Sequence, residues 1–198
     1  MIARRIAVPV LVASLWFSAC RREPPPEPQP TGPTAEELAE RARRDSIAAA
    51  ERARQDSIAR AEAERAERMR ASAAARATLE EMIFFDYDRS EIRSDAERVL
   101  RQKAEILRSS PAVQLRIEGH ADERGSTEYN VALGSRRAES VRQYFSNFGL
   151  AGDRFSIVSY GEERPLVSEA NESAWARNRR AEFVITAGAD QIVPVGDR

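Results

Sequence analysis

Apolar residues in the second half of the chain follow the two-residue period of strands. Residues 82–85 form a short apolar run, which indicates a buried strand. Residues 113–117 alternate between apolar and polar, which predicts a strand with one buried face. Residues 155–160 predict a third strand, and the alternation over residues 181–185 predicts a fourth.

Between these strands, apolar residues instead recur every three or four positions, as they do on a helix. Ser94 and Glu97 have the spacing of a capping box at the start of one such helix. The strongest pattern runs over residues 131–148 and ends at Gly149, which predicts a long amphipathic helix. Gly134, on its inner face, lets this helix approach the sheet closely.

A short helix is also expected over residues 169–178, so the elements follow the order β-α-β-α-β-(α)-β. This order predicts an α/β (α+β) two-layer sandwich of about 110 residues. We place this domain at residues 79–187 and expect residues 188–198 to form a loose tail.

A long helix is predicted ahead of the domain. Residues 34–78 contain no glycine or proline and consist mostly of Ala, Arg and Glu, which are strong helix formers. Thr34 and Glu37 form a capping box at its start. Such a helix reaches roughly 68 Å, and we interpret it as a spacer.

Isoleucines in this helix mark an eleven-residue repeat. Ile47 and Ile58 occupy the same place in two copies of a five-residue motif, and Met69 continues the series. An eleven-residue repeat favours a straight or slightly right-handed helix. The apolar stripe is thin, so weak self-association or a partner helix stays open beside the spacer role.

The start of the chain has the features of an export signal. Two arginines precede an apolar run over residues 6–17, and small residues follow it. The run is shorter than the ~20 apolar residues that span a bilayer. Residues 1–19 are therefore predicted to be a signal peptide of the lipoprotein type.

Cys20, the single cysteine, directly follows the small residues. This arrangement resembles the bacterial lipobox and implies that Cys20 is acylated, which would anchor the chain to a membrane. Arg21 stands where lipoproteins of the inner membrane usually carry Asp, so the resemblance implies the outer membrane. Residues 20–33 then form a proline-rich tether. The alternative is an unmodified thiol.

Composition argues against several classes of function. The chain has 31 basic and 32 acidic side chains, so its charge gives no case for nucleic-acid binding. One histidine and one cysteine leave no material for a His/Cys metal cluster or a Cys-His dyad. No Gly-x-Ser-x-Gly motif is present either. We therefore expect no enzyme, no metal and no cofactor.

Two opposite charges mark the strongest candidate site. Asp122 follows the second strand, and Arg137 lies about two turns into the helix after it. A helix packed back on the strand brings both charges to one shallow rim. The pair can then hold a zwitterion, with Asp122 binding an ammonium and Arg137 gripping a carboxylate. The alternative is a structural ion pair.

Short motifs follow one another in a fixed order through residues 80–187. One of them is an Asp, ten residues, a Leu, then Arg-Ala four residues on, and a Val. In this chain these are Asp122, Leu133, Arg137-Ala138 and Val141. The other segments are FDYD at residues 85–88, EGHADERG at 118–125, EYN at 128–130 and NRRA at 178–181.

These motifs resemble those of the OmpA-like C-terminal domain family, and within it the peptidoglycan-associated lipoprotein (Pal) family. The resemblance implies non-covalent binding to peptidoglycan through the diaminopimelate of its stem peptides. Asp122 would bind the ammonium and Arg137 the carboxylate of that side chain, while Asp88, Asn130 and Leu133 complete the rim.

The resemblance also implies an outer-membrane lipoprotein, anchored by its lipid, that tethers the membrane to the wall within the Tol-Pal system of envelope integrity and cell division. Glu123, Arg124 and Tyr129 would then form a rim for the periplasmic propeller protein of the Tol system. The alternative is an OmpA-like stator or anchoring domain of a motor or other envelope complex.

Four further residues are interpreted structurally. His120 is expected to orient the loop or lie on the surface, and Trp175 is expected in the core. Arg179 and Arg180 are expected to brace the last strand.

Overall fold

The computed structural model describes residues 32–195. The predicted signal peptide and Cys20, with most of the tether, lie outside the described residues. The chain divides into two compact units, with the boundary in sequence between Ala53 and Arg54. Within the described range, no helix combines the length and the apolar character needed to cross a membrane.

Helix α1 (Ala35–Glu80) forms where the helix-rich composition predicts it, within two residues at its end. Its predicted capping box is confirmed. The Thr34 backbone N–H donates to Glu37 Oε2 at 2.8 Å, and the Glu37 N–H donates to Thr34 Oγ1 at 3.3 Å.

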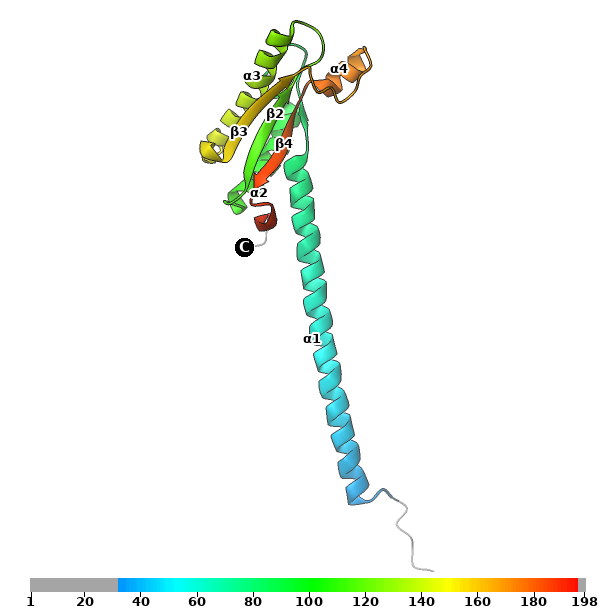
Figure 1. Cartoon of the computed structure of the whole chain (residues 1–198). Coiled ribbons are helices and arrows are strands. Elements are labelled where there is room, and N and C mark those ends of the chain that lie inside the picture. Colours follow the sequence, from blue (N-terminus) through cyan, green and yellow to red (C-terminus); the bar gives the residue numbers. More distant parts are fainter. Residues whose placement is uncertain (1–31, 196–198) are drawn as a thin grey trace, which may run out of the picture. The chain divides into compact units, whose positions relative to one another are not determined.

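The domain is a four-stranded sheet with two long helices on one face, which confirms the predicted two-layer architecture (Figure 1). The strand order is β1-β4-β2-β3, with β2 parallel to β3 and the other two pairings antiparallel. The strands are β1 (Ile83–Phe84), β2 (Gln114–His120), β3 (Phe155–Gly161) and β4 (Arg180–Ala187), and the helices are α2 (Ser94–Ser109), α3 (Thr127–Asn147) and α4 (Glu172–Asn178).

Helix α3 packs directly on the backbone of β2. This close approach was predicted from Gly134, which has no side chain. A Cβ atom built on Gly134 would lie 2.7 Å from the carbonyl oxygen of Gly119. Two glycines therefore face each other where helix and strand meet, and this contact fixes how the end of β2 sits against α3.

Helix α2 begins differently from its prediction. Arg93, not Ser94, is the N-cap residue, and no side chain caps the helix. The Arg93 guanidinium instead binds Asp95 at 3.0 Å and Asp86 at 3.2 Å. The predicted Ser94–Glu97 capping box is therefore wrong, because Ser94 is already inside the first turn.

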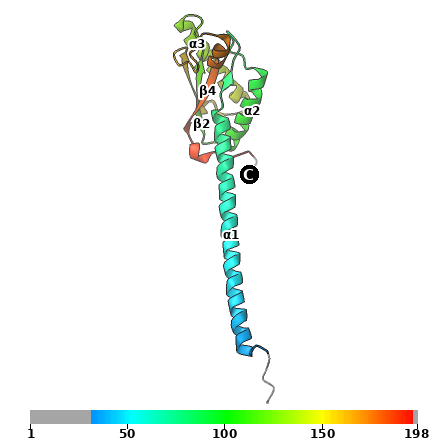
Figure 2. The ribbon, with the colours of Figure 1, turned by 90° about the vertical axis from the view of Figure 1, so that its right-hand side faces the viewer.

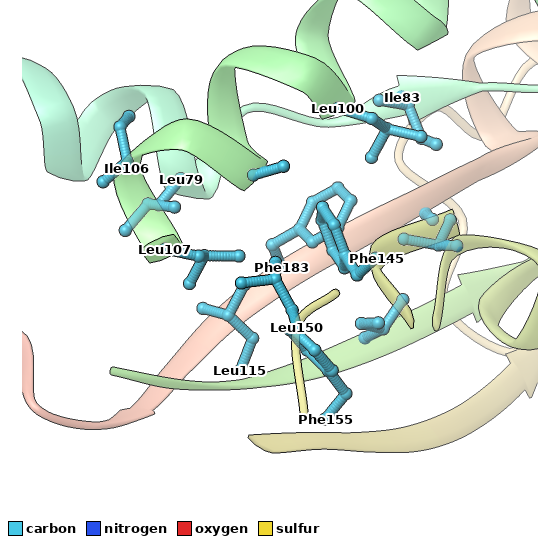
Figure 3. Packing of buried hydrophobic residues seen from close by; sticks show 14 of the residues in the cluster. Leu79, Ile83, Leu100, Ile106, Leu107, Leu115, Phe145, Leu150, Phe155 and Phe183 are labelled. Atoms are coloured by element: carbon cyan, nitrogen blue, oxygen red, sulfur yellow. The ribbon is translucent and has the colours of Figure 1, made fainter. Parts of the chain in front are cut away.

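Aromatic rings fill the centre of the core (Figure 3). The Phe145 ring stacks on Phe155 at 5.0 Å and meets Phe183 edge-on at 6.3 Å between ring centroids. Leu79, from the last turn of α1, is fully buried in the same cluster. The core thus includes the end of the long helix.

The segment after β4 is also part of the domain. Gly188 turns the chain with φ 72°, and a 3-10 helix (Ala189–Gln191) follows. Ile192 is buried in the core, and the Val193 N–H donates to Ser110 Oγ at 2.9 Å. The prediction of a loose tail is wrong as far as Val193, because an apolar residue there completes the core.

The end of α1 lies beside α2 (Figure 2), and a buried lysine of α2 attaches the two. Lys103 Nζ donates to the backbone carbonyl oxygens of Thr78, Leu79 and Glu81 at 2.7, 2.8 and 2.6 Å. The ammonium also lies 3.9 Å from the centroid of the Phe183 ring. All three of its donors are therefore used on backbone carbonyls at and just beyond the end of α1.

Candidate ligand-binding pocket

A pocket of about 130 Å³ opens where three segments meet. The loop after β1 supplies two of its residues, the loop after β2 supplies three, and the first half of α3 supplies four. All five residues predicted to bind peptidoglycan line this one pocket. Its lining consists of Tyr87, Asp88, Asp122, Arg124, Gly125, Tyr129, Asn130, Leu133 and Arg137.

Arg137 forms the floor of the pocket rather than its rim. The residue is fully buried, and its guanidinium donates to the backbone carbonyls of Arg89 at 2.9 Å, His120 at 2.7 Å and Asp86 at 3.2 Å. Five N–H groups minus these three bonds leave two N–H groups, one on each terminal nitrogen. The side chain therefore holds the ends of β1 and β2 together and keeps two donors.

Burial also changes the acidity of this guanidinium. It lowers the pKa of Arg137 to about 10, although the nearby Asp122 carboxylate opposes the shift. Arg137 is still charged at neutral pH. The predicted position of Arg137 on a shallow rim is wrong, because three carbonyls from two chain segments converge on it from inside the domain.

Asp122 is paired with two other arginines, not with Arg137. Its Oδ1 accepts from the backbone N–H and Nε of Arg124, both at 3.1 Å, and its Oδ2 accepts from Arg124 at 2.8 Å and Arg179 at 3.2 Å. Burial alone would raise the pKa of Asp122, but these hydrogen bonds outweigh it and lower the pKa. All four acceptor positions of the carboxylate are occupied.

Arg124 covers Asp122 from the solvent side. Its guanidinium lies between the rings of Tyr87 and Trp175, 4.0 and 4.3 Å from their centroids. Trp175 is half-buried, and its Nε1 donates to Glu123 Oε1 at 3.0 Å. The prediction that Trp175 belongs to the core is wrong, because the cation and the rim carboxylate hold the indole at the surface.

The lining of the pocket also includes Asp88, Asn130 and Leu133. Asp88 is exposed, has φ 54°, and accepts a hydrogen bond from the Tyr129 hydroxyl. Asn130 is buried and donates to the backbone carbonyl of Arg124 at 3.3 Å. Leu133 is 5% exposed and supplies apolar surface.

Arg179 contributes more than the predicted brace. It donates to the Phe85 carbonyl at 3.1 Å and to Glu172 at 2.8 Å, besides Asp122. Arg180 bonds Glu182 and the Arg164 carbonyl and stays structural. Sequence reasoning missed Tyr87 in the pocket lining and the hydrogen bond from Arg179 to Asp122, although the aromatic residue beside Asp88 was a usable signal.

Three groups beneath the sheet resemble a set of metal ligands. Glu118, His120 and Glu182 place one ligand atom each within 4.8 Å of one another. However, Arg116 Nε donates to Glu118 at 2.7 Å and Arg180 Nε donates to Glu182 at 2.6 Å. Because guanidiniums already neutralise both carboxylates, we assign no metal to this cluster.

His120 is 1% exposed at the end of β2, so a place on the surface, one of its two predicted roles, is wrong. Neither ring nitrogen has a hydrogen-bond partner in the part of the chain that the structure describes. Tyr160 stacks on the imidazole at 5.5 Å between centroids. Burial and the nearby Arg180 lower the pKa of His120 to about 4, while Glu182 acts in the opposite direction.

Replacing His120 by phenylalanine should remove part of the acid sensitivity of the domain. The unfolded chain takes up a proton near pH 6.5 and the folded one only near pH 4. The stability contributed by a neutral His120 is therefore complete above pH 6.5 and is lost as pH falls toward 4. Denaturant unfolding from pH 7.5 to 4 should show a loss about 3 kcal/mol smaller in the variant. Equal losses in both proteins would contradict this.

With the geometry described, comparison with known proteins identifies the family. The OmpA family model matches residues 84–179. A crystal structure of the peptidoglycan-associated lipoprotein from Burkholderia pseudomallei is 39% identical, with a TM-score of 0.52, and the match covers 53% of this chain and 89% of that one. The chain belongs to the OmpA family.

Curated members of the OmpA family with similar sequences carry the same name. The peptidoglycan-associated lipoprotein of Rhizobium meliloti is 46% identical over 105 residues, which are 53% of this chain and 60% of that protein. That of Brucella melitensis is 45% identical over 105 residues, or 53% of this chain and 62% of the relative. The match thus spans about 60% of the length of these relatives.

Proposed function

We propose that this protein is an outer-membrane lipoprotein that binds peptidoglycan non-covalently through the zwitterionic end of diaminopimelate. The observation that carries the proposal is that Asp88, Asp122 and Arg137, two carboxylates and a guanidinium, line one pocket. The names of the similar proteins support it. The role is one of binding rather than catalysis.

The pocket divides the two charges of the ligand between its walls. Arg137 offers its two remaining N–H groups to the carboxylate. Asp88, which is exposed, attracts the ammonium from the opposite wall. Asp122 also accepts a hydrogen bond from the ammonium once Arg124 gives up one of its own hydrogen bonds to the Asp122 carboxylate. Each charge-assisted hydrogen bond contributes roughly 1.5–3 kcal/mol before desolvation.

The lipid anchor makes modest affinity sufficient. An acylated Cys20 would hold the domain at the membrane, where it meets a polymeric ligand at high effective concentration. Many weak contacts then connect membrane and wall while each one dissociates readily. Arg124 and Tyr129 line the pocket, and Glu123 is next to Arg124 in sequence, so we propose that the Tol propeller protein and peptidoglycan compete for this surface.

Sedimentation with purified cell wall tests the proposal. Residues 21–198 should pellet with diaminopimelate-type wall, and Asp122→Asn and Asp88→Asn should each weaken binding roughly tenfold or more. Glu139→Gln, a half-buried acid on α3 outside the pocket, is the matched control and should bind as the wild type does. Circular dichroism verifies that each variant is folded.

Wall chemistry provides a second arm of this experiment. Lysine-type wall lacks the side-chain carboxylate, so binding would leave the Arg137 donors unpaired, and the interaction should be much weaker. Equal pelleting with both wall types, or unchanged pelleting of both carboxylate variants, would overturn the proposed function.

A further inference from the structure

Helix α1 presents an apolar stripe to solvent. Ile58 and Met69 are 48% and 65% exposed, and Ile47, one repeat earlier, is 58% exposed. Residues eleven apart complete about three helical turns, so they lie on one face of a continuous helix. Exposed large apolar residues at a regular interval mark a surface for another helix.

Opposite charges flank the stripe on its two sides. An eleven-residue repeat makes three turns of the helix. A residue four positions before a residue of the stripe therefore lies about 33° to one side of it, and a residue four positions after lies about 33° to the other side. The first side carries Arg54 and Arg65. The second side carries Glu51 and Glu62. The repeat therefore has a basic edge and an acidic edge.

These edges determine which way a second helix can run. In a parallel pair the left edge of one helix meets the right edge of its partner, so here Arg meets Glu on both sides of the seam. In an antiparallel pair like edges meet, so Arg faces Arg and Glu faces Glu. We propose that α1 pairs in parallel and in register with α1 of a second copy of this chain.

The flanking charges are not committed within their own helix. In the described length of α1, ion pairs within 4.0 Å join Arg44 to Glu40 and Arg76 to Glu80. Arg54, Glu62 and Arg65 form none. They are thus available to a partner, and a helix from a copy of the same chain supplies the complementary order along residues 51–65.

Disulfide trapping of the full-length chain in cells tests the pairing. Ile47→Cys and Met69→Cys, made separately, should each give a disulfide-linked dimer on mild oxidation, because in register each position faces itself. Arg60→Cys lies on the opposite face of α1 and is the matched control. The unmodified sequence, which contains Cys20 alone, gives the background.

The expected result is a dimer yield at residues 47 and 69 several-fold above that of Arg60→Cys. An antiparallel pair centred on Ile58 would bring residue 47 near residue 69, so neither single variant would link to itself. Absence of both links, or equal linking by Arg60→Cys, overturns the proposal. Wall binding plays no part in this readout, so the result is independent of the proposed function.

Charge exchange supplies a second test. In the Ile47→Cys background, Arg54→Glu with Arg65→Glu makes both edges acidic and should reduce the linked dimer several-fold. Adding Glu51→Arg and Glu62→Arg exchanges the two edges and should restore it. If the variant with all four exchanges did not recover the yield of linked dimer, charge matching would be excluded as the reason why the helices pair in parallel.

Discussion

Replacing Arg137 by methionine should lower the free energy of unfolding by about 3–5 kcal/mol. The guanidinium satisfies three backbone carbonyls, those of Asp86, Arg89 and His120, and methionine can donate to none of them. Thermal or denaturant unfolding measures the loss. Wall binding should disappear as well, since the carboxylate of the ligand loses its partner.

Arg136→Met is the matched control for this prediction. It makes the same exchange one position earlier on α3, at an exposed side chain that does not line the pocket. Its free energy of unfolding should stay within about 0.5 kcal/mol of the wild type. If the two variants were equally stable, Arg137 would have no structural role, and its function would be recognition alone.

Replacing Lys103 by methionine should destabilise the domain by about 2–4 kcal/mol at pH 7 and release the last turn of α1. Three carbonyl oxygens at that helix end would lose their donor. Hydrogen exchange should show faster amide exchange over residues 75–80, while Arg101→Met, an exposed neighbour on α2, should leave it unchanged.

The stability of the Lys103→Met variant should also depend on pH differently from that of the wild type. Burial lowers the pKa of Lys103 to about 7, against 10.5 for an exposed lysine, so the unfolded chain binds more protons between these values. Wild-type stability should therefore gain a contribution of roughly 4 kcal/mol as pH rises from 7 to 10.5. The methionine variant should lack that gain. Parallel curves for the two proteins would disprove the assignment.

The order of strands and helices could be predicted from periodicity because each element has one buried face. The approach of α3 to β2 followed from Gly134, and the meeting of Asp122 with Arg137 in one pocket followed from the strand-to-helix spacing. These features depend on local sequence, so one sequence is enough to infer them.

The partners of buried charges could not be predicted in this way. Asp122 binds Arg124 and Arg179, and the second lies 57 positions away in sequence. Arg137 and Lys103 carry charges, which favour a place at the surface, yet both are fully buried. Their burial depends on where carbonyl oxygens from distant segments converge, and no local pattern encodes that convergence.

Lys103 is the only lysine in the sequence. In the native fold its ammonium is enclosed, so reagents that modify side-chain amines find no target on the domain surface until the region around α2 opens. The rate at which such a reagent labels the protein therefore reports local opening at one known atom, without any engineered probe.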